Sequence, residues 1–532
     1  MSGPSATRPL RVAIVGLGPK GLFAFERLVN HARDLPAGSI YLTIYEPSPA
    51  PGAGPVYDPA QPDYLRMNFA AELVDMWPEG LGPSFSEWRR KAGGLGDEAY
   101  PPRGQVGRYL AEGFERLIAE APDSMSVDLR AERVDAVTSQ AGGWLATAET
   151  AGEHDEVLVA TGHEDEWDGA LAALRPSSDG PQTRVFPVER ELSRGRIPPG
   201  SRVAVRGFAL TMIDAALALT EGRGGKFHEG REPFLMRYES AIDEVALIAP
   251  WSRTGRPMLA KPDPRHAIRS RAIDETAASG REAILALPAG SGLGAVIGLL
   301  ARVAAKSLHS VAQLAGHTAK DLAALLEASA RGEPLPTDVS PAAEIEQSLT
   351  VASGAAVPGP TWALGNTWRA LYPSLVERLG EDGLDAREWP AFLLLAREME
   401  RLAFGPPPVN AAKLLALIEA GKVDLSHAST GPSSNADVIV DAVLPPPGAA
   451  NIRQPVLESI LSGAHARIPP GRRGIEITRD VECVGADGSP TRGLGVIGRP
   501  TEDWIIGNDT LNRDLHPQAD RWARRVAGRA SA

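Results

Sequence analysis

A glycine-rich turn near the start of the 532-residue chain constrains the fold more than any other feature. Residues 16–21 read GLGPKG and match the pattern G-x-G-x-x-G. They follow the apolar run LRVAIV at 10–15, which is typical of a strand buried on both faces, and precede a helical pattern at 22–31. A second strand pattern, IYLTIY, lies at 40–45. This order predicts a βαβ unit.

Each residue type in the turn has a physical purpose. Gly16 permits the tight turn, Gly18 lets the backbone approach a pyrophosphate, and Gly21 lets the helix pack close to the strand. Pro19 suits the first helical turn, where its missing N–H leaves no hydrogen bond unmade. The free N–H groups at this helix end, beside Lys20, favour bound phosphate. We therefore expect these five residues to bind a dinucleotide.

A carboxylate stands where this unit would bind a ribose. Glu46 ends the second strand, thirty residues after Gly16 instead of the usual roughly 20. A longer first helix and the loop at 34–39 account for the difference. A ribose-binding acid without a basic neighbour favours FAD or NAD over NADP at this first site. The alternative is a structural glycine turn with a solvated glutamate.

A second βαβ pattern begins with RVAVR at 202–206 and continues through a turn and a helix to a strand at 244–248. The turn starts at Gly207 but has Ala209 and Met212 at the second and third glycine positions. The methyl group of Ala209 would point toward the pyrophosphate, and Met212 would hold the helix further from the strand. We expect weak, transient binding of a nicotinamide nucleotide there.

Two βαβ units, with Ala160-Thr161-Gly162 just before the second, are the layout of two-dinucleotide flavoproteins. In such proteins the first site holds FAD and an inserted second domain holds NAD(P)H. From 293 to 423 almost all patterns are helical, and strand patterns return at 437–443, 475–481, 494–497 and 503–506.

The predicted fold class is therefore α/β, with two Rossmann-like dinucleotide-binding domains and a mostly helical segment. The length agrees with about three domains. The expected boundaries are 8–200 for the first part of the FAD-binding domain, 201–290 for the second Rossmann-like domain of NAD(P) type, 291–430 for a helical insert or cap and 431–532 for the part that completes the FAD domain.

Composition removes several classes of function. With 55 Lys and Arg against 67 Asp and Glu, the net charge of −12 argues against a nucleic-acid partner. The single cysteine, Cys483, leaves no Cys-x-x-Cys pair and excludes a disulfide reductase, and the scattered histidines give no metal-ligand spacing. The uncharged stretch 283–301 contains Pro288 and four glycines, so we interpret it as a buried loop and helix, not a membrane span. Without a signal peptide, the chain is expected in the cytoplasm.

Several motifs together resemble the bacterial FAD/NAD(P)-binding oxidoreductases related to flavin-dependent monooxygenases. The resemblance covers most of the chain and rests on nine segments: GLGPKG at 16–21, PGAGPVYD at 51–58, LRMN at 65–68, YPPRGQVGRYL at 100–110, VATGH at 159–163, VAVRGFALTMIDA at 203–215, EGRGGKF at 221–227, SRTGRPMLAKP at 252–262 and IGRPTEDWIIGNDT at 497–510.

The resemblance implies which residues surround the FAD. The implied set comes from five segments of the chain: Gly16, Gly18, Gly21, Glu46, Met67, Asn68, Thr161, Gly162 and Asn508. Arg103, His163 and His516 are candidate polar groups of the same site, although a lone histidine is more often structural. The catalytic residues stay unassigned, because in flavin monooxygenases the oxygen chemistry is the cofactor's.

Two arginines follow the second strand of the second unit. In SRTGR at 252–256, Arg253 and Arg256 could take up a 2′-phosphate, which favours NADPH over NADH. The alternative is a pair of arginines on a solvated loop. The fingerprint F-x-G-x-x-x-H-x-x-x-W/Y of Baeyer–Villiger enzymes has no match at Phe186, which argues against ketone and thioether oxygenation.

Three functions remain open. The first is an FAD-dependent, NADPH-using monooxygenase that uses molecular oxygen to oxygenate a small molecule, with N-hydroxylation of an amine or amino acid as the expected reaction. The second is an FAD-dependent dehydrogenase or oxidase without oxygen insertion, which the imperfect second turn favours. The third is a flavin-binding protein that is not an enzyme.

Overall fold

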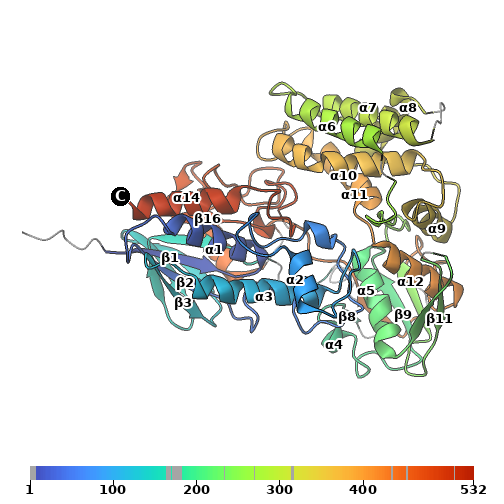
Figure 1. The fold of residues 1–532 in the computed structure, drawn as a ribbon, viewed down its shortest axis with the longest axis horizontal. Coiled ribbons are helices and arrows are strands. Elements are labelled where there is room, and N and C mark those ends of the chain that lie inside the picture. Colours follow the sequence, from blue (N-terminus) through green and yellow to red (C-terminus); the bar gives the residue numbers. More distant parts are fainter. Residues whose placement is uncertain are drawn as a thin grey trace, which may run out of the picture. The chain divides into compact units, whose positions relative to one another are not determined.

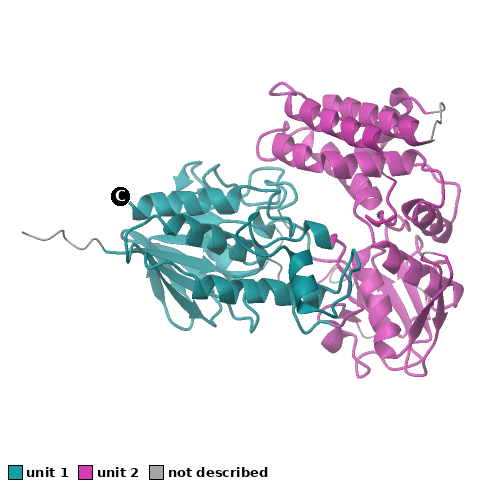
Figure 2. Ribbon diagram, viewed as in Figure 1, with its two compact units in different colours: residues 1–61, 71–167, 445–532 teal, residues 62–70, 168–444 magenta. Residues whose placement is uncertain are grey.

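The computed structural model describes residues 8–162, 169, 182–232, 234–268, 270–312, 317–432, 435–450, 453–508 and 510–532. The chain forms two compact units, which Figure 2 shows in different colours. Unit 1 comprises residues 1–61, 71–167 and 445–532, and unit 2 comprises residues 62–70 and 168–444. Each unit has its own parallel sheet, and each sheet contains one of the two predicted βαβ folds.

Unit 1 is built on a five-stranded parallel sheet with the strand order β16-β7-β1-β2-β3 (Figure 1). The first βαβ unit is confirmed and consists of β1 (Leu10–Val15), α1 (Pro19–Ala32) and β2 (Ile40–Tyr45). The other strands are β3 (Met125–Arg130), β7 (Glu156–Val159) and β16 (Leu494–Val496). The chain order reverses between β1 and β7, and doubly wound sheets bind ligands at such a switch point.

The C-terminal helix holds the sheet of unit 1 from one side. Helix α14 (Gln518–Ala530) packs against α1, and Arg525 and Arg529 of α14 form ion pairs with Glu156, which is fully buried at the start of β7. The other elements of unit 1 are α2 (Phe85–Ala92), α3 (Arg103–Ala119), α13 (Pro455–Ser462), a sheet of β4 (Ala136–Gln140), β5 (Gly143–Thr147) and β6 (Gly152–His154), the hairpin β14 (Cys483–Val484) and β15 (Pro490–Thr491), and the 3-10 helices η1 (Pro55–Tyr57), η2 (Ala71–Leu73) and η5 (Arg499–Thr501).

Unit 2 contains a four-stranded parallel sheet in the order β12-β9-β13-β8. Strand β9 (Arg202–Arg206) and helix α5 (Leu210–Leu219) form where the sequence predicts them, whereas the next strand, β12 (Leu247–Trp251), begins later than the predicted 244–248. The other two strands are β8 (Gln182–Arg184) and β13 (Val438–Asp441). Here the order reverses between β9 and β13, so the switch point of this sheet lies between those two strands.

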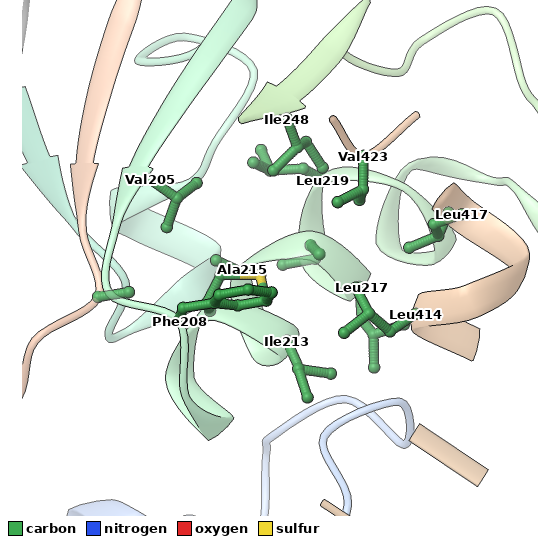
Figure 3. Packing of buried hydrophobic residues seen from close by; sticks show 14 of the residues in the cluster. Val205, Phe208, Ile213, Ala215, Leu217, Leu219, Ile248, Leu414, Leu417 and Val423 are labelled. Carbon is green, nitrogen blue, oxygen red and sulfur yellow. The ribbon is translucent and has the colours of Figure 1, made fainter. Parts of the chain in front are cut away.

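The core of this sheet is formed with α5 and α12 (Pro408–Glu419). Every residue of α5 from Thr211 to Leu219 is buried, and all of them except Thr211 and Asp214 are apolar, as is typical of a helix within a core. Figure 3 shows side chains from β9, the following turn, α5, β12 and α12 packed into one cluster, among them Val205, Phe208, Leu217, Ile248 and Leu414. Smaller elements of the same unit are α4 (Val188–Glu191), η4 (Glu221–Arg223) and the antiparallel hairpin β10 (Lys226–Glu229) and β11 (Met236–Glu239).

The helical patterns of the sequence form a helical region inside unit 2. Its helices are α6 (Arg271–Leu285), α7 (Leu293–Ala312), α8 (Ala319–Ala330), α9 (Pro341–Ala352), α10 (Pro360–Leu379) and α11 (Trp389–Ala403). Among the described residues, α7 is the one helix long and apolar enough to cross a membrane, with a mean hydropathy of 1.2 over Leu293–Val311. Core helices meet the same test, and α7 packs against α6, α8 and α10.

The sequence assigned one strand to a different sheet from the one it occupies. The strand expected near 437–443, within the part that completes the FAD domain, is β13, and it pairs with β9 in unit 2. The backbone N–H of Arg202 donates to the carboxylate of Asp437 across 235 positions of the chain. Local patterns carry no information about a partner so distant.

Two expected strands do not form. At 475–481 and 503–506 the backbone makes only single bridges to a neighbouring segment. The φ angles of Val481 (64°) and Asp503 (88°) are positive, which interrupts an extended conformation. Apolar alternation in these segments reflects burial in a loop and not a strand.

Candidate functional site

The glycine turn of unit 1 has the geometry that its sequence predicts. Gly16 has a φ of +88°, and a Cβ there would lie 2.8 Å from the carbonyl oxygen of Ala160. A Cβ at Gly21 would lie only 2.3 Å from the carbonyl oxygen of Gly16. Beside Gly18, in contrast, the nearest atom to an added Cβ is the Cα of Gly54, at 3.9 Å. Two of the glycines therefore close the turn, and the third leaves an open backbone surface.

That open surface is the N-terminus of α1. Gly18 is the N-cap residue and has no side chain to satisfy the first N–H groups of the helix. The first turn contains Pro19 and Lys20 and no acidic residue. Free N–H groups, the helix dipole and a lysine together favour a bound anion. The cradle fits the pyrophosphate of a dinucleotide.

Glu46, which directly follows β2, braces the glycine turn. It is 8% exposed, and its two carboxylate oxygens accept the backbone N–H groups of Leu17 at 2.6 Å and Ser48 at 2.8 Å. A carboxylate has about four lone-pair positions, so bracing two N–H groups does not by itself prevent it from accepting ribose hydroxyls. The sequence predicted the position of this residue but not its structural role.

The end of β7 lies against the same turn. The hydroxyl of Thr161 donates to Oε1 of Gln454 at 2.5 Å, and Gly162 has a φ of +66°. Gln454 is nearly buried at the N-cap of α13, and no sequence motif had indicated it. His163, also expected at this site, lies outside the described residues.

The C-terminal segment closes this edge of unit 1 near Lys20. A Cβ on Gly498 would lie 3.3 Å from Cγ of Lys20. Asn508 is buried, and its Nδ2 donates to Thr501 at 2.6 Å, so it braces the loop from inside. His516 bonds the carbonyl oxygen of Ile506 through Nε2 at 2.8 Å. Burial, with Lys20 nearby, lowers the pKa of His516 to about 3, so the ring is neutral.

Three other expected residues lie on further segments of the chain. Arg103 is the first residue of α3 in unit 1. Met67 and Asn68 belong to unit 2, because the segment 62–70 packs there and buries Leu65 in that unit's core. The carbonyl oxygen of Asn68 accepts a hydrogen bond from Lys261. Burial lowers the pKa of Lys261 to about 7, so this amine titrates near neutrality.

The turn of unit 2 repeats the backbone of the first with different side chains. Gly207 has a φ of +113°, and its N–H donates to the carbonyl oxygen of Trp251 at 2.8 Å. In unit 1, the N–H of Gly16 donates to the equivalent oxygen of Tyr45 at 2.9 Å. Ala209 is the exposed N-cap of α5, and Met212 is buried in the core.

The two arginines that follow β12 have different environments in the structure. Arg256 forms ion pairs with Glu344 and Glu398, both at 3.0 Å, and its side chain is 11% exposed. It braces the loop against α9 and α11, so the expectation that both arginines face a 2′-phosphate is wrong for Arg256. Arg253 is exposed at the carboxyl edge of the sheet, next to Ser252. The sequence could not separate them, because each stands in the same short loop.

Comparisons with known proteins agree with this architecture. The family model described as FAD-NAD(P)-binding matches residues 13–164, which contain the glycine turn, Glu46 and Thr161. The nitrosuccinic acid synthase of Aspergillus oryzae is 35% identical over 49% of this chain, and the match spans 42% of that protein's length.

A longer match extends over nearly the whole chain. The nitrosuccinate-forming L-aspartate N-monooxygenase of Streptomyces cremeus is 28% identical over 94% of this chain and 91% of its own. Among solved structures, the ornithine hydroxylase of Pseudomonas aeruginosa has a TM-score of 0.51 at 11% identity, covering 98% of this chain and 99% of that chain. At this identity the likeness shows the fold alone, and it confirms the predicted α/β class.

Proposed function

We propose, from the premise that this chain belongs to the FAD/NAD(P)-binding oxidoreductases related to flavin-dependent monooxygenases, that it is an NADPH-using monooxygenase that hydroxylates an amine nitrogen. The substrate we propose is L-aspartate or a closely related amino dicarboxylic acid. The observation that carries the proposal is the alignment over 94% of the chain with an L-aspartate N-monooxygenase.

The proposed reaction balances with one molecule of oxygen. One oxygen atom enters an N–H bond of the amino group and gives the hydroxylamine. The other oxygen atom leaves as water, with a hydride (two electrons and one proton) from NADPH and one further proton from solvent. FAD, when bound, supplies the electron transfer and the oxygen chemistry.

The residues of unit 1 have binding roles in this proposal. The N-terminus of α1, with Gly18 and Lys20, would hold the pyrophosphate of FAD, and Glu46 would accept the ribose hydroxyls while it braces the turn. Thr161 and Gln454 would border the cofactor at the end of β7. These groups bind and orient; none of them is proposed to transfer a proton.

The preference for NADPH follows from the register of the second sheet. In unit 1, the last residue of β1, Val15, pairs with Tyr45, and Glu46 is the next residue after Tyr45. In unit 2, the last residue of β9, Arg206, pairs with Trp251, and Ser252 is the next residue after Trp251. Ser252 therefore occupies the position of the ribose-binding acid, so no carboxylate there repels a 2′-phosphate. The exposed Arg253 next to it would supply the positive charge.

The test is anaerobic stopped-flow reduction of the FAD-reconstituted protein by NADPH and by NADH, followed by mixing with oxygen and L-aspartate. We expect faster reduction by NADPH at low concentration, and N-hydroxyaspartate by mass spectrometry. Arg253→Ala should raise the apparent Kd for NADPH about tenfold and leave that for NADH unchanged, and Gly18→Val should contain no FAD. Reduction by NADPH with only peroxide as product for every amino acid tried would contradict N-hydroxylation.

A second candidate is an FAD oxidase that needs no nicotinamide. The exposed methyl group of Ala209 at the turn of unit 2 favours it, because that turn lacks the second glycine. The same experiment separates the two proposals. Flavin reduction by L-aspartate alone, with no reduction by NADPH, would establish the oxidase.

A further inference from the structure

A charged side chain stands at the switch point of unit 2, where unit 1 has none. Arg206 is the last residue of β9, immediately before Gly207, and its register partners are Trp251 on β12 and Asp441 on β13. In unit 1 the equivalent residue, Val15, pairs with Tyr45 and Val159. Val15 and Val159 are both apolar and buried, so the fold does not require charge at this position.

The orientation of Arg206 follows from strand alternation. Val203 and Val205 face the core beside α5, as Figure 3 shows for Val205. Because side chains alternate along a strand, Arg202 and Arg206 lie on the other face, with Ala204 between them. Arg206 is thus at the carboxyl edge, where parallel sheets bind their ligands, and Arg202 is at the amino edge.

The guanidinium of Arg206 is not fully satisfied by the protein. Its Nη1 atom is buried and has no hydrogen-bond partner among the residues that the structure describes. The neighbouring carboxylate of Asp441 accepts the backbone N–H of Val443 at 3.1 Å. Burying a donor without a partner costs free energy, so a bound group that accepts a hydrogen bond from this Nη1 atom would be favoured.

The turn beside Arg206 also lacks a positive charge that unit 1 has. Lys20 stands two residues after Gly18 in the first turn of α1, whereas Thr211 stands two residues after Ala209 in α5. A pyrophosphate bound at Gly207 would therefore meet helix N–H groups but no cation from the helix itself. Arg206 is the cation next to that turn in sequence.

We propose that Arg206 binds the pyrophosphate of the nicotinamide dinucleotide in unit 2 and substitutes for the missing lysine and glycine of that turn. The inference rests on the proposed use of a nicotinamide nucleotide. The proposed role of Arg206 differs from that of Arg253, because NADPH and NADH both contain the pyrophosphate but only NADPH contains the 2′-phosphate. Arg206 is thus a determinant of affinity, and Arg253 is a determinant of specificity.

The test is isothermal titration of the FAD-loaded protein with NADP⁺ and with NAD⁺. Arg206→Met should raise Kd for both nucleotides by the same factor, about tenfold or more, because a hydrogen bond to a charged group is lost. Arg206→Lys keeps the charge and should have a smaller effect. Arg202→Met is the matched control: it removes the same charge from the same strand and face at the opposite edge, and it should leave both values unchanged.

Three results would overturn the proposal. An unchanged Kd in Arg206→Met, with or without a lower Tm, would make the residue structural. A higher Kd for NADP⁺ alone would place Arg206 in the 2′-phosphate site. A higher KM for L-aspartate with unchanged nucleotide binding would place Arg206 in the substrate site. If the wild type binds neither nucleotide, the proposed function fails together with this inference; if the wild type binds and the variant binds equally, only this inference fails.

Discussion

The glycine turns of the two units share a backbone conformation but differ in the residues that surround the proposed nucleotide site. Gly16 and Gly207 both have positive φ, and both donate to the last carbonyl oxygen of the adjacent strand. Unit 1 then continues with two more glycines and a lysine, and a buried carboxylate braces the turn. Unit 2 continues with an alanine and a buried methionine.

This difference separates a fitted site from an electrostatic one. In unit 1 the close approach of helix and strand leaves bare backbone for the pyrophosphate, which suits a cofactor that stays bound. In the proposed site of unit 2 the charge would come from side chains at the carboxyl edge, Arg253 and Arg206, which would suit a nucleotide that leaves after each turnover. Charge-based binding is also more sensitive to salt than a fitted backbone cradle.

The largest effect should come from placing the methionine of unit 2 in unit 1. Gly21→Met puts a Cβ within 2.3 Å of the Gly16 carbonyl oxygen, so the turn must open and the protein should lose FAD and several kcal/mol of stability. Flavin absorbance and Tm measure this. The reverse change, Met212→Gly, should cost about 2–5 kcal/mol through a cavity in the core of unit 2 yet leave FAD bound. Retention of FAD by Gly21→Met would show that the third glycine is dispensable.

The second effect concerns acid stability, which should differ between the units. Burial lowers the pKa of His154 in unit 1 to about 4, and its Nε2 lies 3.1 Å from the hydroxyl of Tyr45. Because the unfolded chain takes up the proton first, this neutral histidine contributes stability above about pH 6.5 that is lost as the pH falls toward 4. The loss is up to about 3 kcal/mol.

Hydrogen exchange at pH 7 and pH 4.5 measures that loss in β2 and β6. His154→Phe removes one of the two buried histidines of unit 1 whose pKa is lowered, the other being His516, so the pH dependence in these strands should become shallower. An equal loss in β9 and β12, which lie in unit 2, would mean that a different group controls the acid sensitivity.

The sequence could predict a feature of this comparison only where the residues that form it are close together along the chain. The turn at Gly16, its strands and the weaker turn at Gly207 were predictable, because each depends on a few consecutive residues. Three other features could not be predicted, because they join segments hundreds of positions apart. They are the pairing of β13 with β9 in unit 2, the hydrogen bond between Thr161 and Gln454, and the ion pairs of Glu156 with α14. Arg256 was misassigned because its partners, Glu344 and Glu398, lie on distant helices.

The third effect tests the ribose positions. Ser252→Glu gives unit 2 the acid that unit 1 has at Glu46, and the added charge should repel a 2′-phosphate and accept a 2′-hydroxyl. We expect Kd for NADPH to rise about tenfold while that for NADH is unchanged or lower. Thr254→Glu adds the same charge to an exposed neighbouring position and serves as the control. Equal weakening of both nucleotides would mean that Ser252 is not at the ribose.

The smallest effect should come from exchanging the residues at the helix N-caps. Ala209→Gly removes the methyl group from the second turn, and glycine is preferred to alanine at an N-cap, so α5 should not lose stability. The Kd for NADPH should fall by less than tenfold, a change below about 1.4 kcal/mol, and the Kd for NADH should fall by the same factor.

Gly18→Ala makes the opposite change in unit 1, where the nearest atom to the new Cβ would be 3.9 Å away. That variant should fold normally and bind FAD more weakly, because the methyl group occupies space meant for the pyrophosphate and not for protein. If Ala209→Gly left nucleotide binding unchanged while Gly18→Ala weakened FAD, the second site would depend on its arginines and not on the shape of its turn.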